Sequence, residues 1–252
     1  KLFVAVFFYV LMVGFVLQFW LLPVAMPSLH AGNGLLKGGD WIGFHKIAIE
    51  LAEKIHVDGW KNWELRPEFH APSGVAAALY VITGVEKPWV VLPLNALLFA
   101  MGAVFLFRIL WLFAPPKIAG IGTLPYVFFP SAIMVYGQIH KDVYSITGFM
   151  AICLAWVTIA KPNKYQWRVV FVVFILIAWG SFLVWVVRPY LLQIILAGVL
   201  MAWITINLLH AKSMNWTWRC MALGCLLVQF AIYQTAQTAQ TAQTAQTAQT
   251  AQ

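Results

Sequence analysis

The sequence predicts an all-α integral membrane protein, a polytopic bundle of about seven spanning helices with a long first outer loop. Of its 252 residues, 62% are hydrophobic and only 10% are charged, whereas soluble domains carry roughly 25% charged residues. So much apolar surface cannot be hidden in one aqueous core. The formal net charge is +8. We therefore assign the excess Lys and Arg residues to cytoplasmic loops and a phosphate-binding site rather than to a nucleic-acid interface.

Apolar runs of the length needed to cross a bilayer follow one another along the chain. A spanning helix requires about 20 predominantly apolar residues. The runs interpreted as spanning helices are 2–24, 89–113, 118–137, 143–160, 169–187, 190–209 and 220–233, of which the last is short. The first run is longer than the apolar core of a signal peptide, so we expect it to be a retained membrane helix.

A polar stretch, residues 27–72, separates the first two runs and contains an amphipathic helix. In GFHKIAIELAEKI, the apolar residues Ile47, Leu51 and Ile55 recur at helical spacing, which predicts a helix suited to lying on the membrane surface. The apolar segment that follows, 73–85, has about 13 residues and is too short to span. We expect it to be a re-entrant or juxtamembrane helix.

The distribution of charge orients these elements in the membrane. If segment 73–85 does not cross, the first loop, 25–88, lies outside, and so do all eight acidic residues. The inside loops then carry basic residues alone, as the positive-inside rule requires. These basic residues are Arg108, Lys117, Lys161, Lys164, Arg168, Lys212 and Arg219. The same arrangement brings to the outer face Asp40, His70, His140, Lys141, Asp142 and Arg188.

The C-terminal residues form a low-complexity tail. Residues 235–252 repeat the triplet TAQ. They are uncharged and offer no side chain that could anchor a core, so no fold is expected there. We therefore divide the chain into a membrane module, 1–233, and a tail, 234–252. Because the tail interrupts an apolar run, we expect the natural reading frame to continue as further membrane helices.

Several short motifs occur in a defined order between the first helix and residue 190. They are D-x3-F-x3-A from Asp40, GWKNW, RPEFHAPSG, LYVITG, PLNALL with Asn95, P-x5-Y-x4-KD ending at Lys141 and Asp142, and RPY at Arg188 to Tyr190. In this order and spacing, over roughly residues 1–210, the chain resembles the membrane glycosyltransferases of the GT-C superfamily, which use polyprenyl-phosphate sugars as donors. It is most similar to bacterial relatives of the dolichyl-phosphate-mannose–protein mannosyltransferases. Members of that family are usually longer, so the chain resembles a truncated member.

The resemblance implies that Asp40 is the general base. Sugar transfer requires that a proton be removed from the acceptor hydroxyl, and a carboxylate within about 3 Å of that hydroxyl can remove it. Gly38 and Gly39 leave the backbone free to bring Asp40 close to a substrate. The alternative is that Asp40 caps the amphipathic helix that follows it.

The donor phosphate is expected to be bound by basic side chains. Lys141 would act as a point charge and Arg188 through its bidentate fork, while Asp142 would orient Lys141, a substrate hydroxyl or a metal ion. The alternatives are a helix-end ion pair for Lys141 and Asp142 and an Arg188 that extends to the lipid–water interface. The resemblance also implies that His70 lies near the phosphate, unless it is only an interfacial turn residue.

The complete predicted site combines one catalytic residue with six substrate-binding residues. Asp40 is the catalytic residue, and the substrate-binding residues are His70, His140, Lys141, Asp142, Arg188 and Tyr190. His45 is a weaker candidate. Trp41, Trp60 and Trp63 are interpreted as interfacial residues in preference to a platform on which sugars stack.

The expected activity is inverting transfer of a hexose or pentose from a polyprenyl-phosphate donor to an acceptor hydroxyl on a lipid, glycan or protein. The reaction would occur at the outer face of the bacterial inner membrane, with membrane lipids as further partners and no nucleic acid. The sequence contains no Gly-rich nucleotide loop. No metal ligand is assigned and no cofactor is certain, and a divalent ion, Mg or Mn, at Asp40 stays open.

Two other functions stay open. A polysaccharide polymerase or ligase would use a diphosphate-linked lipid glycan as its donor. A transporter or flippase would require ionisable residues or broken helices near the middle of the membrane. The expected spans contain almost no charge apart from Arg108 near an inside end, which favours chemistry at the interface over passage through the bilayer.

Overall fold

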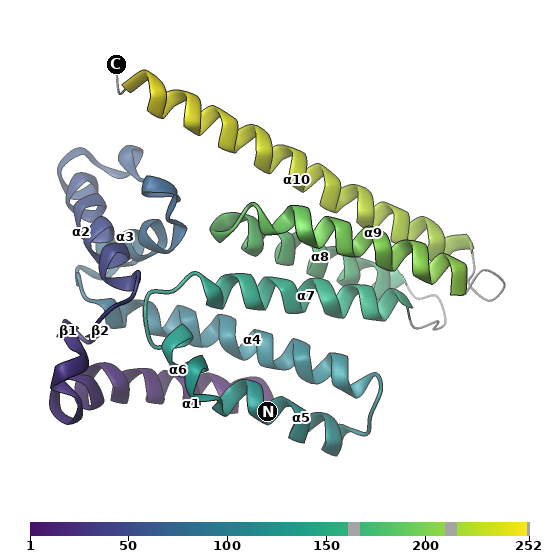
Figure 1. Ribbon diagram of the computed structural model, residues 1–252, viewed down its shortest axis with the longest axis horizontal. Helices are drawn as coiled ribbons and strands as arrows, with labels where there is room; N and C mark the ends of the chain where they lie inside the picture. The colour runs from purple at the N-terminus through teal and green to yellow at the C-terminus, as the bar shows by residue number, and fades with distance from the viewer. Residues whose placement is uncertain (161–166, 210–215, 251–252) are drawn as a thin grey trace. The chain divides into compact units, whose positions relative to one another are not determined.

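The computed structural model describes residues 1–160, 167–209 and 216–250, and these residues are mostly helical. Their helices and strands are α1 (Leu2–Val16), η1 (Leu17–Ala25), η2 (Pro27–Leu29), β1 (His30–Gly32), β2 (Leu35–Leu36), α2 (Trp41–Asp58), η3 (Trp60–Asn62), η4 (Pro67–Phe69), α3 (Ala71–Thr83), η5 (Pro88–Val91), α4 (Leu92–Trp111), α5 (Pro116–Phe128), α6 (Pro130–Tyr136), α7 (Asp142–Ala160), α8 (Trp167–Val187), α9 (Leu191–Leu209) and α10 (Trp216–Thr250). Figure 1 labels the α-helices and the two strands. The chain divides into two compact units, Lys1–Thr147 and Gly148–Gln252.

Five helices are long and apolar enough to cross a membrane, which confirms a helical, multi-pass membrane protein. They are Leu2–Ala25, Pro88–Trp111, Asp142–Ala160, Trp167–Val187 and Leu191–Leu208. The predicted last span, 220–233, lies inside the longer helix α10 and does not qualify. The described residues therefore contain five spans, or six if one bent pair of helices is counted, where we expected about seven.

The bent pair replaces the straight span expected at 118–137. It consists of α5 and α6, whose axes differ by 66°. Pro130 has no backbone N–H, and its ring excludes helical geometry from the residue before it. Phe129 accordingly has a ψ of 131° and ends α5. The prediction of one span rested on hydropathy, which does not detect the break that Pro130 introduces between two helices.

In the first unit, the membrane part is built on α1 and α4, which run side by side (Figure 1). One face of α1 buries Val10 and Gly14. Leu92 lies 3.0 Å from the position that a Cβ on Gly14 would take, so the missing side chain leaves room for it. Phe8 and Met12 are exposed on another face of α1, as expected of a helix that contacts lipid.

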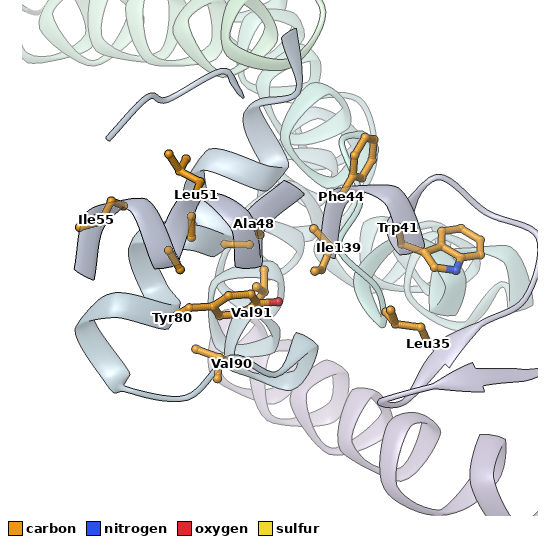
Figure 2. Close-up of a cluster of buried hydrophobic side chains, with 13 residues drawn as sticks. Leu35, Trp41, Phe44, Ala48, Leu51, Ile55, Tyr80, Val90, Val91 and Ile139 are labelled. Carbon is orange, nitrogen blue, oxygen red and sulfur yellow. The ribbon is translucent and has the colours of Figure 1, made fainter. Parts of the chain in front are cut away.

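The outer part of the first unit is built on α2 and α3, which pack against each other (Figure 1). As predicted, α2 is amphipathic, and it buries Phe44, Ala48, Leu51 and Ile55 (Figure 2). These side chains share a core with Ala76, Ala77, Tyr80, Val90, Val91 and Ile139. The apolar face of α2 is therefore covered by protein, not by the membrane surface on which it was expected to lie.

Helix α3 and the hairpin complete this outer part. With 13 residues, α3 is too short to span a bilayer, as the sequence predicted for this segment. Strands β1 and β2 are antiparallel and are joined by Asn33 and Gly34, which have positive φ values of 52° and 77°. Asn-Gly is the residue pair that a tight two-residue hairpin favours. Lys87 donates a hydrogen bond to Asn33 Oδ1 at 2.9 Å and ties the turn to the segment that precedes α4.

In the second unit, α10 packs against both α8 and α9. The apolar core of this unit joins Ile152 and Trp156 of α7 to Ile177, Met221 and Cys225. Helices α7 and α8 approach most closely at Gly148 and Gly180. A Cβ on either glycine would lie 2.6 Å from the backbone oxygen of the other. Small residues allow spanning helices to approach closely and gain van der Waals contact.

The TAQ repeats continue α10 as far as Thr250, although no fold was expected for them. Ala and Gln are good helix formers, and the repeats contain neither Gly nor Pro. The hydroxyls of Thr235 and Thr238 donate to the carbonyls of Ala231 and Gln234, four residues earlier. The helix therefore arises from local propensity and needs no apolar face.

The contact between Gly148 and Gly180 makes a testable prediction. Gly180→Ala should lower the free energy of unfolding by about 1–3 kcal/mol, because the new methyl group would meet a backbone oxygen that cannot move aside. Gly198→Ala in α9 is the matched control, because no atom lies within 4 Å of the position of its Cβ. The control should be neutral or slightly stabilising. Thermal unfolding of both variants in detergent measures the difference, and equal melting temperatures would contradict the prediction.

Candidate functional site

The candidate site is centred on Asp40 and Lys141, which lie 101 positions apart in the chain. Lys141 Nζ is 3.4 Å from Asp40 Oδ2, and the two side chains are 30% and 68% exposed. Asp40 precedes α2, and Lys141 lies in the short segment between α6 and α7. The tertiary structure thus brings together two residues that the motifs had named separately.

Asp40 occupies the N-cap position of α2, but its side chain makes no capping hydrogen bond. The geometry therefore does not support the interpretation of Asp40 as a helix cap. The carboxylate is open to solvent on the side that Lys141 does not cover. An ionised carboxylate has several lone pairs, so Asp40 can accept a proton or hydrogen bond from a second group while Lys141 stays in place.

The backbone before Asp40 is shaped by Trp41. The side chain of Trp41 is only 6% exposed, and its indole N–H donates to the Leu36 carbonyl. A Cβ on Gly39 would lie 2.1 Å from the Trp41 ring, so only glycine fits beneath the ring. Trp41 is therefore a core residue that positions Asp40, and its interpretation as an interfacial residue was wrong.

Lys141 is positioned by buried amide side chains. Asn95 Nδ2 donates to the carbonyls of Tyr136 and Gln138, at 3.0 and 2.7 Å. Gln138 Nε2 donates to the Gly34 carbonyl at 3.2 Å, and Gln138 Oε1 accepts from the Leu36 N–H at 3.3 Å. These bonds tie the segment after α6 to α4 and to the hairpin.

A third amide secures the same segment from the end of the first helix. Gln18 Nε2 donates to the Gly137 carbonyl at 2.8 Å. Gln18, Asn95 and Gln138 are all buried. We call these three side chains the amide cluster. Asn95 was quoted only as part of a motif, and the sequence analysis did not select Gln18 or Gln138. Their polarity within apolar runs is the signal that identifies them.

Phe44 joins Lys141 to His70. Lys141 Nζ lies 5.9 Å from the centroid of the Phe44 ring, within the range of a cation–π interaction. The ring of His70 lies 5.0 Å from the same ring, and His70 is the N-cap residue of α3. The sequence analysis noted Phe44 only as the aromatic residue four positions after Asp40, and it did not predict this bridging role.

His140 and Asp142 flank Lys141. His140 Nδ1 accepts a hydrogen bond from the Asp142 N–H at 3.0 Å and lies 3.6 Å from Asp142 Oδ2. In this geometry Nδ1 is the acceptor nitrogen of the ring, which leaves Nε2 as its possible donor. Asp142 lies in the first turn of α7, where the negative charge of a carboxylate interacts favourably with the helix dipole. The ring of His140 also lies 5.9 Å from that of Trp41.

Arg188 and Tyr190 belong to the second unit, in the short connection between α8 and α9. Arg188 is partly buried, and Tyr190 is exposed. Their predicted place beside Asp40 stays a prediction. The structure therefore brings together Asp40, Lys141 and their neighbours within the first unit.

A buried pair supports α2 beneath the site. His45 Nδ1 and the Tyr80 hydroxyl share a hydrogen bond of 2.9 Å in the interface between α2 and α3. Burial, assisted by Lys87, lowers the pKa of His45 to about 4. Burial also raises the pKa of Tyr80, with a smaller contribution from Glu86. Both groups are therefore neutral near pH 7, and His45 serves as a structural residue rather than as a ligand.

No cation site is visible in the part of the chain that the structure describes. No three His, Cys, Asp or Glu side chains come together there in an arrangement that could hold a metal ion. Comparisons of the chain with protein-family models, with curated proteins and with solved structures found no match. The case for a function therefore depends on the motifs and on the geometry around Asp40.

The amide cluster predicts a specific loss of stability. Asn95→Leu should lower the free energy of unfolding by about 1–3 kcal/mol, because two buried carbonyls lose their only amide donor from α4. Asn207→Leu is the matched control, because within the described residues Asn207 Nδ2 bonds the Trp203 carbonyl of its own helix, at 2.8 Å, and joins no second element. Chemical or thermal unfolding in detergent compares the two. A larger loss in the control than in Asn95→Leu would contradict the assigned role.

The buried imidazole predicts a dependence of stability on pH. The pKa of His45 is about 4 in the folded chain against an ordinary value of 6.5. As the pH falls from 6.5 to 4, the unfolded chain therefore gains a proton that the folded chain does not. Stability should fall across that window by up to about 3 kcal/mol. His45→Asn should remove this part of the profile. Melting curves of both proteins between pH 7 and 4.5 measure it, and parallel profiles would show that His45 contributes nothing.

Proposed function

We propose that the chain is a membrane glycosyltransferase that transfers a sugar from a polyprenyl phosphate to an acceptor hydroxyl. The observation that carries the proposal is the pairing of an exposed Asp40 carboxylate with Lys141 at 3.4 Å. The pair joins the first and the sixth of the motifs on which the resemblance to the GT-C superfamily depends. A base and a cation side by side are what this reaction requires, because one substrate loses a proton and the other carries a phosphate.

In the proposed reaction, Asp40 is the general base. The acceptor oxygen attacks the anomeric carbon, its proton passes to the Asp40 carboxylate, and the bond between the anomeric carbon and the phosphate oxygen breaks. The phosphate leaves with the electron pair and stays attached to its lipid. Direct displacement inverts the configuration at the anomeric carbon. General-base catalysis requires the carboxylate within hydrogen-bonding distance of the hydroxyl, and the exposed Asp40 permits that approach.

Lys141 is proposed to stabilise the phosphate as negative charge develops on it. An ammonium group carries three donors. One of these faces Asp40, and the others can bind phosphate oxygens. His70 and His140 lie close to the same centre through Phe44 and Trp41 and can contribute further donors. Asp142, next to Lys141 in the chain, is proposed to orient a substrate hydroxyl.

The membrane spans explain why the donor would be a lipid. A polyprenyl tail is apolar and needs a bilayer or apolar helix surface, and several spans expose large apolar side chains. The reacting phosphate and sugar would lie at the lipid–water boundary of the outer face of the inner membrane. The proposed acceptor is a hydroxyl of a lipid, glycan or protein on that side.

The proposal is tested with the purified chain in nanodiscs and a panel of radiolabelled polyprenyl-phosphate hexoses and pentoses. Asp40→Asn should lower kcat about 100-fold or more, because the amide cannot accept the proton, while the KM for the donor changes little. Lys141→Gln should instead raise the KM for the donor about tenfold or more, because a charged donor to the phosphate is lost.

Glu53→Gln is the matched control, since Glu53 is an exposed carboxylate on the same helix as Asp40. It should retain wild-type kcat and KM. Undiminished turnover by Asp40→Asn would refute the proposal. Loss of turnover in Glu53→Gln equal to that in Asp40→Asn would show that the effect is not specific to the candidate site.

A further inference from the structure

A concave surface of the first unit, separate from the candidate site, lies along α2. It is a groove of about 450 Å³ between α2, η3 and η4. Its floor includes the buried residues Leu51 and Pro67. Its walls carry the charged and exposed residues Glu50, Lys54, Asp58, Lys61, Glu64 and Glu68. None of these six belongs to the candidate site around Asp40, so the groove calls for an explanation of its own.

The charges of the groove favour a neutral ligand with many hydroxyl groups. Four of the chain's eight acidic residues line it, together with two lysines. A polyanion would be repelled by the four carboxylates, while Lys54 and Lys61 offset part of the attraction that a basic peptide would experience. A hydroxyl group both donates and accepts hydrogen bonds, so a polyhydroxylated molecule can use the carboxylates and the ammonium groups at once.

Two tryptophans lie in the segment 60–64, which contributes Lys61, Asn62 and Glu64 to the groove. Trp60 and Trp63 are 51% and 37% exposed and alternate in sequence with groove residues. The indole N–H of Trp63 donates to the Gly74 carbonyl at 2.9 Å, which ties its ring to α3. A ring held in this way offers a rigid apolar face at little cost in side-chain entropy. The C–H face of a pyranose is apolar and can cover such a ring, while its hydroxyls reach the charged walls.

The groove is aligned with Asp40. Along α2, residues 40, 47, 51, 54 and 58 are separated by seven, four, three and four positions, which places them on one stripe of the helix. Ile47, the first groove residue of α2, lies about 10 Å from Asp40 along the helix axis. A chain molecule that lies in the groove therefore extends along the stripe that Asp40 begins.

From these observations, we propose that the groove binds a neutral glycan chain, with Trp60 and Trp63 stacking on pyranose rings and Glu64, Lys61 and their neighbours bonding hydroxyl groups. The further step, that this glycan is the acceptor whose hydroxyl reaches Asp40, rests on the proposed function. Binding itself does not depend on that function. It is therefore tested separately.

The test measures binding of neutral tetrasaccharides of glucose, mannose and galactose to the full chain in nanodiscs, by calorimetry and by tryptophan fluorescence. At least one of them should bind saturably. Trp60→Ala and Glu64→Gln should each weaken that binding about fivefold or more. The matched controls are Trp20→Ala, an exposed tryptophan of η1, and Glu53→Gln, an exposed carboxylate outside the groove. Both should bind as the wild type does, and all four variants should keep the wild-type melting temperature.

Several results would overturn the proposal. They are the absence of saturable binding to every tetrasaccharide, an equal loss of binding in Trp20→Ala and Trp60→Ala, and binding of an oligolysine peptide, but of no sugar, that requires Glu64. Asp40→Asn should retain sugar binding. If the chain binds sugar but transfers none, only the proposed function is wrong. If it transfers sugar in an Asp40-dependent way but binds no tetrasaccharide, only the glycan groove is wrong.

Discussion

The amide cluster is the restraint on which the rest of the first unit depends. Helices satisfy their own backbone groups, but the segment between α6 and α7 is not helical, and its carbonyls are buried between other elements. Buried carbonyls without donors are costly, above all near a membrane. Gln18 and Asn95 supply the missing donors from the first helix and from α4, and Gln138 of the segment itself donates to the Gly34 carbonyl of the hairpin. Because each bond joins a different element, no one of these elements can shift without breaking a buried hydrogen bond.

The positions of Asp40 and Lys141 depend on the amide cluster and on the apolar core between α2 and α3. Beneath Asp40 and Lys141 lie Phe44, Trp41 and Ile139, all of them buried, and Figure 2 shows how they lie together. The neutral pair of His45 and Tyr80 fills the same interface without adding a buried charge. A rigid apolar base with exposed charged groups above it is the arrangement that holds a reactive constellation in place before a substrate arrives.

The proposed reaction and the proposed glycan groove share one element, α2. Its first residues are positioned by the hairpin and by Trp41 packed on Gly39, and its buried face is held by α3. The stripe that begins at Asp40 carries the charged groove residues Lys54 and Asp58 toward its far end. If a lipid-linked donor approaches from the spanning helices and a water-soluble acceptor lies along the stripe, the two meet at Asp40. The amphipathic character of α2 thus serves the site through its polar face, while its apolar face provides the anchor.

The sequence by itself determined the membrane class, most of the spans, the amphipathic helix and the short helix after it, because these depend on composition and on local periodicity. It also selected Asp40 and Lys141, since their motifs are local. It missed the break at Pro130, the helical TAQ repeats and the burial of Trp41, where proline geometry, local propensity or packing outweighs hydropathy. Only the tertiary structure decided that Lys141 meets Asp40, that Phe44 lies between Lys141 and His70, and that Gln18, Asn95 and Gln138 act together. These contacts join residues far apart in the chain, and no local pattern encodes the distance between two side chains that the fold alone brings together.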